Sequence, residues 1–195
     1  MAIILVLAGL VLSISSYVQN KGARSRAEAE IAAMSAALES YKADNGIYPR
    51  ATATDSLTAV TDQAFATKTP PDPVPTGYES DPRKSSADVM KYIAASFSLY
   101  AQLSGNLNGD RSTVTQRTYF HFKPNMLYPT GGTGTVVAVV DPFGDAYGFS
   151  TAKAKYTEDP TAQNYGFNPT FDLWSTGDTH TAADALYEAK WIKNW

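Results

Sequence analysis

Few side chains in this 195-residue sequence stand in patterns that support catalysis. The two histidines, His121 and His180, do not form a His-Glu-x-x-His pair of the kind that binds zinc. No Gly-x-Ser-x-Gly nucleophile elbow occurs, and the glycine run at 131–134 lacks the lysine and helix of a phosphate-binding loop. Without cysteine there is no thiolate chemistry and no disulfide. We therefore expect a protein that is not an enzyme, with His121 a structural residue of a strand.

One segment places oxygen-bearing side chains at alternating positions. Asn106, Asn108 and Asp110 have the spacing that begins an EF-hand calcium loop, but no glutamate follows at the distal position. We expect a polar turn here. The net charge of −3 gives no electrostatic reason to expect a nucleic-acid partner.

The first element of the chain is a predicted helix whose two halves differ in composition. Met1–Leu12 is uncharged, Ser13–Asn20 is a polar transition, and a charged helical pattern continues from Lys21 to residue 45. We interpret residues 1–20 as a hydrophobic transmembrane or filament-core helix. Residues 21–195, which include the amphipathic half 21–45, form a globular head of ordinary domain size.

The apolar stretch is short for a membrane crossing. Met1–Ile14 spans roughly 21 Å as a helix, whereas a crossing needs about 20 apolar residues. A cleaved signal would carry a basic residue ahead of the apolar run. A buried soluble helix seldom shows twelve apolar residues on all faces at a chain terminus. We favour a third interpretation, in which the sequence starts inside a longer transmembrane helix. Lys21, Arg24 and Arg26 then either contact anionic lipid headgroups or form a solvated face.

The second half of the helix carries one apolar stripe, which we expect to pack on the head. Its members follow one another at steps of three and four residues: Ala27, Ile31, Met34, Leu38 and Tyr41. Asn45-Gly46 is a helix-stop signal, and Pro49 prevents a restart nearby. Gly22 is a candidate for a bend or local melting of the helix.

The remaining sequence predicts an α+β head with a small antiparallel sheet. Arg50–Lys84 is rich in loops, with four prolines in Thr69–Thr76 and a short helical turn around Asp55–Ala66. A second helix is expected over Ser85–Ser104, opened by a capping box of Ser85 and Asp88. Strands are expected at Thr118–Lys123, Val136–Asp141, the end of Asp141–Ser150, and Phe171–Trp174.

The helix resembles that of the type IV pilin and type II secretion pseudopilin superfamily, entered partway. The family's opening motif, with its single glutamate, and the prepilin-peptidase site are not found in this sequence. The stretch Glu28–Pro49 is most similar to the helix end of the major, G-type pseudopilin. The matching positions are Tyr41, Lys42, Asp44, Asn45, Tyr48 and Pro49.

The C-terminal third carries the same resemblance. Asp141–Tyr147 is similar to the family's Asp-Pro-Trp-Gly-x-Pro-Tyr segment, with Phe143 for Trp and Ala146 for the second Pro. Phe171–Asp178 resembles its Asp-rich Ser-x-Gly stretch, and Trp191–Trp195 resembles its Ile-x-x-Trp ending. Residues 50–135 do not match closely. The resemblance implies a pilin-like fold, with the long helix packed on the sheet.

The resemblance also implies a calcium ion near the C-terminus, held in the family by carboxylates and backbone carbonyls. The candidate ligands here are Asp178, Asp184 and Thr176, with Glu188 as a further carboxylate. Calcium takes 6–8 oxygens, and Trp191 stands where the family has an acidic residue. The alternative is that the site is lost and that Trp191 and Trp195 pack the tail instead.

These observations predict a structural subunit of a helical filament, in the periplasm or at the cell surface. A type II secretion pseudopilus subunit is the interpretation we favour. A type IV pilus subunit, major or minor, and a membrane-anchored periplasmic enzyme or ligand-binding domain are the alternatives. The partners implied are copies of this chain, other pseudopilins or pilins, an inner-membrane assembly platform, and membrane lipid before assembly. The location implied is the bacterial inner membrane with a periplasmic head, or the assembled filament.

Overall fold

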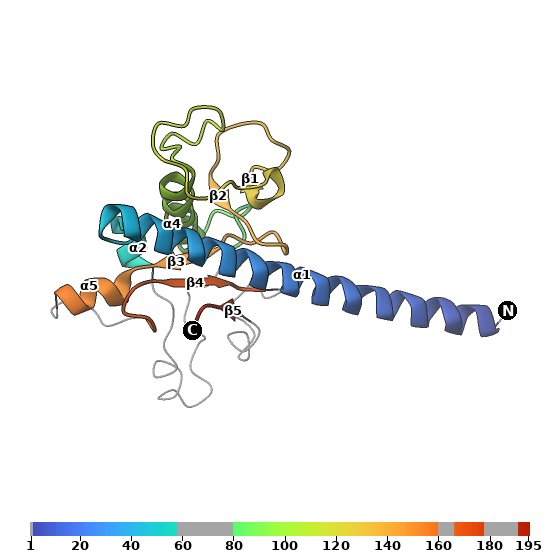
Figure 1. The fold of residues 1–195 in the computed structure, drawn as a ribbon. Helices are drawn as coiled ribbons and strands as arrows, with labels where there is room; N and C mark the ends of the chain where they lie inside the picture. The colour runs from blue at the N-terminus through green and yellow to red at the C-terminus, as the bar shows by residue number, and fades with distance from the viewer. Residues whose placement is uncertain (1, 58–79, 160–165, 178–190) are drawn as a thin grey trace.

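A computed structural model describes residues 2–57, 80–159, 166–177 and 191–195 of the chain. It has the predicted α+β architecture, in which a long N-terminal helix lies along one side of a head with two small antiparallel sheets (Figure 1). The helices are α1 (Ala2–Asn45), α2 (Thr52–Ser56), α4 (Ala87–Ser104) and α5 (Ala152–Glu158), with the 3-10 helix η1 at Pro124–Met126. The strands are β1 (Leu127–Tyr128), β2 (Ala138–Val139), β3 (Gly148–Ser150), β4 (Asp172–Ser175) and β5 (Ile192–Lys193).

Helix α1 is unbroken over 44 residues, including Gly22, so the predicted melting there is not observed. The helix ends where the sequence signal places the stop. The N–H of Gly46 donates to the carbonyl of Lys42 at 2.7 Å, and Gly46 has a φ of 79°, which glycine adopts without a Cβ penalty. The Asn45 side chain adds a bond from Nδ2 to the carbonyl of Tyr41 at 2.8 Å.

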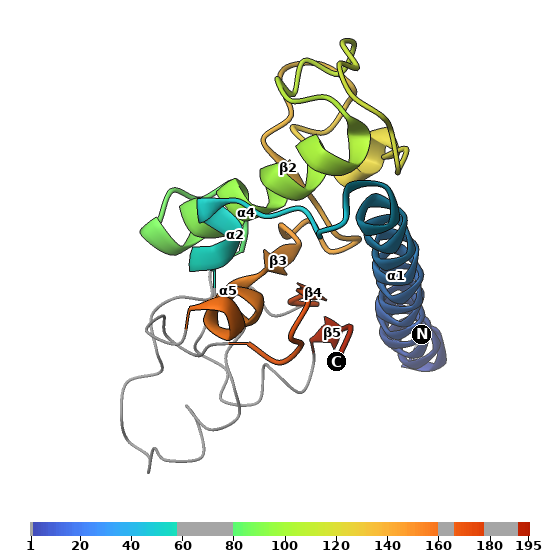
Figure 2. The same ribbon diagram turned by 60° about the vertical axis from the view of Figure 1, so that its left-hand side comes forward.

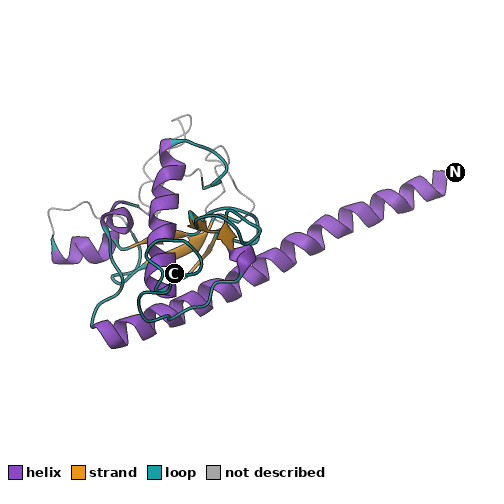
Figure 3. Ribbon diagram, turned by 90° about the horizontal axis from the view of Figure 1, so that it is seen from above, coloured by secondary structure: helices purple, strands orange, loops and turns teal. Residues whose placement is uncertain are grey.

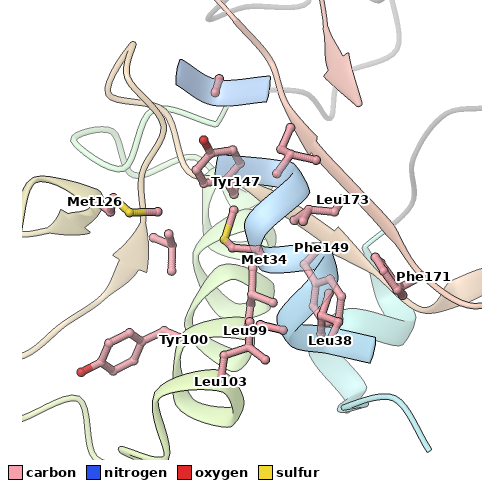
Figure 4. Packing of buried hydrophobic residues seen from close by; sticks show 14 of the residues in the cluster. Met34, Leu38, Leu99, Tyr100, Leu103, Met126, Tyr147, Phe149, Phe171 and Leu173 are labelled. Carbon is pink, nitrogen blue, oxygen red and sulfur yellow. The ribbon is translucent and has the colours of Figure 1, made fainter. Parts of the chain in front are cut away.

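The predicted apolar stripe of α1 is confirmed as the contact between helix and head. Ala27, Met34 and Leu38 are fully buried and Ile31 nearly so, while Tyr41 is partly buried and donates from its hydroxyl to Gln102 at 3.1 Å. Figure 4 shows Met34 and Leu38 meeting Leu99 of α4, with Phe149 and Leu173 of the sheet close by. In Figure 2, α1 is seen almost along its axis, beside the head rather than inside it.

Helix α4 starts one residue later than predicted. The cap is Ser86, whose Oγ accepts from the N–H of Val89 at 3.3 Å, so the predicted capping box from Ser85 is wrong. The apolar side chains that recur along α4 face the core: Val89, Tyr100 and Leu103 are buried, and Ile93 and Phe97 between them are partly buried. Gly105 closes the helix with a φ of 72°.

The sheets are smaller than the sequence predicts. Strand β1 pairs with β2, and β4 lies between β3 and β5, all antiparallel, with Phe149 opposite Leu173. Strands β2, β3 and β4 fall at or within one residue of predicted segments. Gly148 of β3 faces the indole of Trp174, because a Cβ atom there would lie 2.1 Å from that ring.

The predicted strand at Thr118–Lys123 is wrong. This segment is irregular, and its backbone is held by N–H groups of Tyr119 and Phe120 that donate to the carbonyl of Leu103 at 2.7 and 2.9 Å. Strand propensity reports how well a side chain fits a pleated, half-buried surface. Here the aromatic rings are partly buried without a partner strand. Consequently, His121 is an exposed loop residue and not part of a strand.

The connection after α1 is described only in part. Helix α2 begins three residues before the predicted helical turn, and the rest of that turn and the proline-rich segment lie outside the described residues. Helix α5 follows β3 directly and was not predicted.

Candidate assembly surface and C-terminal site

The N-terminal half of α1 extends beyond the head (Figures 1 and 3). We call residues 2–22 the projecting segment. From Ser16 to Gly22 its described side chains are exposed, including Tyr17 at 66% and Val18 at 60%. Burial on the head begins with Ala27, one turn after Arg24 first reaches it. Among the described helices, none is both long enough and apolar enough to span a membrane.

Charged side chains mark the point where α1 meets the head. Arg24 donates from Nη2 to the carbonyl of Trp191 at 3.3 Å, and its Nε lies 3.5 Å from a carboxylate oxygen of Glu28. Arg26 pairs with Glu30 at 3.8 Å in the same i,i+4 geometry. The Arg24–Glu28 pair is exposed, and exposed i,i+4 pairs stabilise a helix by only about 0.3–0.5 kcal/mol. In the second pair Glu30 is largely buried.

The Glu30 carboxylate also binds the head. It accepts a hydrogen bond from the hydroxyl of Tyr147 at 2.7 Å. Burial raises the pKa of Tyr147 above its ordinary value, and the neighbouring charge of Glu30 adds to the effect, so the phenol stays protonated and remains a donor. Tyr147 is fully buried and lies under α1 (Figure 4). This bond fixes the rotation of the helix about its axis.

Only one of the three predicted calcium ligands lies within the described residues. Thr176, predicted to contribute its backbone carbonyl, is buried, and its hydroxyl oxygen lies 2.9 Å from the Oγ of Ser80. Asp178 and Asp184 fall outside the described residues, as does Glu188. Within the ranges described, no group of three or more His, Cys, Asp or Glu side chains could hold a metal ion. The calcium site therefore stays a prediction.

A buried carboxylate that sequence reasoning did not single out lies next to Thr176. Asp141 is 3% exposed, and its Oδ1 accepts from the backbone N–H groups of Phe143 and Asp145 at 2.9 and 3.0 Å. Its Oδ2 accepts from the hydroxyl of Ser175 at 2.5 Å. Burial raises the pKa of Asp141 to about 7, against the opposing effect of the Ser175 hydrogen bond. The side chain ties the turn at 141–145 to the end of β4.

The sequence signal for this contact is local. An aspartate that starts a turn commonly accepts hydrogen bonds from the backbone two residues on. The sequence Asp141-Pro142-Phe143-Gly144 fits that pattern, and Gly144 has a φ of 95°. The bond to Ser175 could not be predicted in the same way, because the two residues are 34 positions apart.

Tryptophan packing closes the C-terminal end of the head. The ring of Trp191 stacks on that of Trp174 with centroids 5.9 Å apart, and Trp174 donates from Nε1 to the hydroxyl of Tyr92 at 3.1 Å. Trp195 stacks on Phe167 at 4.4 Å. Trp191 is 3% exposed, whereas Trp195 is only partly buried. The structure thus shows the tail packed by these rings, and this packing does not test the calcium prediction.

The segment 106–110 is a turn, as predicted. The Oδ1 atom of Asp110 accepts from the N–H groups of Ser112 and Thr113 and from the side-chain amide of Asn106. These bonds lower the pKa of Asp110, because they favour its charged form. The oxygen is therefore saturated by donors of the protein itself.

No protein-family model matches this chain, and neither the curated proteins nor the solved structures include a match.

Proposed function

We propose that this protein is a structural subunit of a helical filament of the pilin type, and that the filament is a type II secretion pseudopilus. The observation that carries the proposal is the division of α1. One continuous helix has its second half built into the head and its first half projecting from it.

The projecting segment needs a partner. Its first twelve residues are uncharged, and a free apolar surface of this kind in water marks a protein or membrane interaction. Membrane lipid covers it before assembly in our proposal, and other copies of the helix cover it afterwards. The head would then lie in the periplasm of a bacterium, with the helix in the inner membrane.

The proposed filament requires a head-to-tail contact. In it, α1 of one subunit contacts a different surface of the next, so the contact is heterologous. Heterologous contacts that do not close into a ring give an open helical assembly. The secretion role rests on the resemblance of Glu28–Pro49 and of the C-terminal segments to the major pseudopilin, and on the lack of cysteine.

A deletion tests the assembly. Removing residues 2–20 leaves Arg24, Ala27 and the whole stripe in place, so the head is expected to stay folded and monomeric. The full chain is expected to form filaments in electron micrographs after removal of detergent. A full-length variant with Lys21 changed to Gln, at an exposed position, is the matched control and should still polymerise. Filaments formed by the deletion variant would overturn the proposal.

A cellular experiment separates secretion from the pilus alternative. Loss of the chain is expected to leave folded exoproteins in the periplasm while surface fibres remain. Loss of fibres and of motility, with secretion intact, would instead identify a type IV pilus subunit.

A further inference from the structure

A pocket of about 330 Å³ opens on the head, away from the contact between α1 and the sheet. It lies between the C-terminal part of α4, the irregular segment that follows α4, and η1 with β1, in the part of the head at the top of Figure 1. Sites for small molecules are mostly apolar hollows of about 300–1,000 Å³ with a few polar groups that fix orientation. The volume is at the lower end of that range, which suits one ring with one substituent.

Aromatic rings form one wall of the pocket. Phe120 and Phe122 meet edge to face with centroids 4.7 Å apart, and Phe122 lies 5.4 Å from Tyr100. Both phenylalanines are only partly buried, so parts of their surface remain open. The aromatic segment that was predicted to be a strand thus forms a wall to which a flat apolar group can bind.

The hydroxyl of Tyr100 is a polar group that opens on the pocket. Tyr100 is 4% exposed and lines the pocket, and its hydroxyl makes no hydrogen bond to the described residues. Figure 4 shows that hydroxyl directed away from Met34 and Leu38 of the core. A phenol oxygen can both donate and accept. The hydroxyl is therefore available to bond a polar group of a ligand in the pocket.

Arg111, whose side chain is held by two hydrogen bonds, provides a positive charge at the pocket. Arg111 has a φ of 66°, which is uncommon for a residue with a Cβ atom and is found at ligand sites. Its Nε donates to the carbonyl of Gly134 at 2.7 Å, and its Nη2 donates to the carbonyl of Pro129. Among the described residues Nη1 has no partner, and no described lining residue is acidic. The guanidinium is therefore held in place, has no acidic side chain next to it in the described pocket lining, and keeps Nη1 for a ligand.

We propose that this pocket binds a small aromatic carboxylate. The ring packs against Phe120 and Phe122, and the carboxylate accepts from Arg111 and from the hydroxyl of Tyr100. A charge-assisted bond to arginine favours the carboxylate over a neutral group. Three other polar lining groups are already bonded within the protein: the Thr118 hydroxyl donates to the carbonyl of Ser104 at 2.9 Å, the Ser104 hydroxyl accepts from the N–H of Asn106, and Asn106 is bonded within the turn. His121 is an exposed lining residue that can also contact a ligand. This inference does not rest on the filament proposal.

The test is a nuclear magnetic resonance titration of the full chain in detergent micelles, with phenylacetate as the probe. We expect saturable shifts of the Tyr100, Phe120 and His121 ring signals. Phenylacetamide has the same shape without the charge and is expected to bind at least about tenfold more weakly, since a hydrogen bond to a charged group is worth about 1.5–3 kcal/mol. Equal binding of acid and amide would overturn the proposal, as would a lack of saturable shifts at these rings.

A pair of variants isolates the hydroxyl. Tyr100→Phe removes one oxygen from the pocket and is expected to weaken phenylacetate about fivefold. Tyr119→Phe removes a hydroxyl that binds Asn45 outside the pocket and should leave the affinity unchanged. An unchanged affinity in Tyr100→Phe would contradict the assignment of this group. A peptide that ends in phenylalanine is titrated last. If the peptide binds and phenylacetate does not, the ligand of the pocket is the end of a protein chain and the proposal of a small molecule is wrong.

Discussion

The two halves of α1 share one helical backbone but differ in what covers them. Residues 27–41 present a narrow stripe that the head buries, whereas residues 2–12 are apolar around the whole circumference and lie beyond it. A stripe needs a single partner surface, and an apolar cylinder needs surroundings on all sides. The comparison teaches that one helix can serve two environments when only its pattern of apolar residues changes.

The largest expected effect comes from placing a carboxylate in each half. Leu38→Asp buries a charge in the core without a partner and is expected to destabilise the head by more than about 3 kcal/mol. Leu10→Asp, in the projecting segment, should leave the melting temperature of the head unchanged and reduce assembly. Near-ultraviolet circular dichroism of both variants in detergent measures the head alone. A Leu38→Asp variant that melts within a few degrees of wild type would show that the head does not depend on burial of the stripe.

The second prediction concerns the C-terminal tail, which Arg24 of α1 contacts. Trp191→Ala removes a buried ring stacked on Trp174, which is expected to destabilise the head by about 3–5 kcal/mol. Trp195→Ala removes a partly exposed ring and should have a smaller effect. Denaturant unfolding of the two variants under one set of conditions gives the order. The reverse order would mean that stacking on Phe167, rather than on Trp174, holds the tail.

The third prediction is that the stability of the head depends on pH and the helicity of the projecting segment does not. The pKa of Asp141 is about 7 in the folded head, above the ordinary 3.8, so the folded state favours the protonated form. Its contribution to stability is greatest below pH 4 and is lost as the pH rises toward 7. In Asp141→Asn, the fall in the free energy of unfolding between pH 4 and pH 8 is expected to be smaller by about 1–3 kcal/mol. Thermal unfolding at pH 4, 5.5 and 8 measures it.

Asp172 leaves a residual pH dependence in the Asp141→Asn variant, because burial raises its pKa as well. The helicity of the projecting segment should not follow the same pH curve, since Asp141 lies in the head. An Asp141→Asn variant that keeps the full pH dependence would show that another group is responsible.

The smallest expected effect tests a helix that lies wholly within the head. Ser86→Ala removes the cap of α4 and should lower the free energy of unfolding by about 1 kcal/mol. Ser85→Ala is the matched control at the neighbouring position and should change it by less than about 0.5 kcal/mol. Chemical denaturation of the two variants compares them directly. A larger loss of free energy of unfolding in Ser85→Ala would show that Ser85, the residue predicted from the sequence, is the cap of α4.

Sequence reasoning predicted the features that depend on neighbours along the chain. The stripe from Ala27 to Leu38, the stop at Gly46, the turn at 106–110 and the approximate positions of β2, β3 and β4 all follow from local spacing. Two errors were also local. The spacing of Ser85 and Asp88 fits a capping box, although the adjacent Ser86 is the cap, and Thr118–Lys123 has strand composition without a strand beside it.

The candidate sites depended on contacts between distant positions. The amino-acid sequence alone determined that α1 has an apolar half and an amphipathic half, because helix periodicity is a property of consecutive residues. Only the tertiary structure decided that Asp141 would meet Ser175, and that Tyr100 and Arg111 would line one pocket. Burial and hydrogen bonding of a side chain are set by residues brought together from across the chain, and their energies appear only once the core has formed.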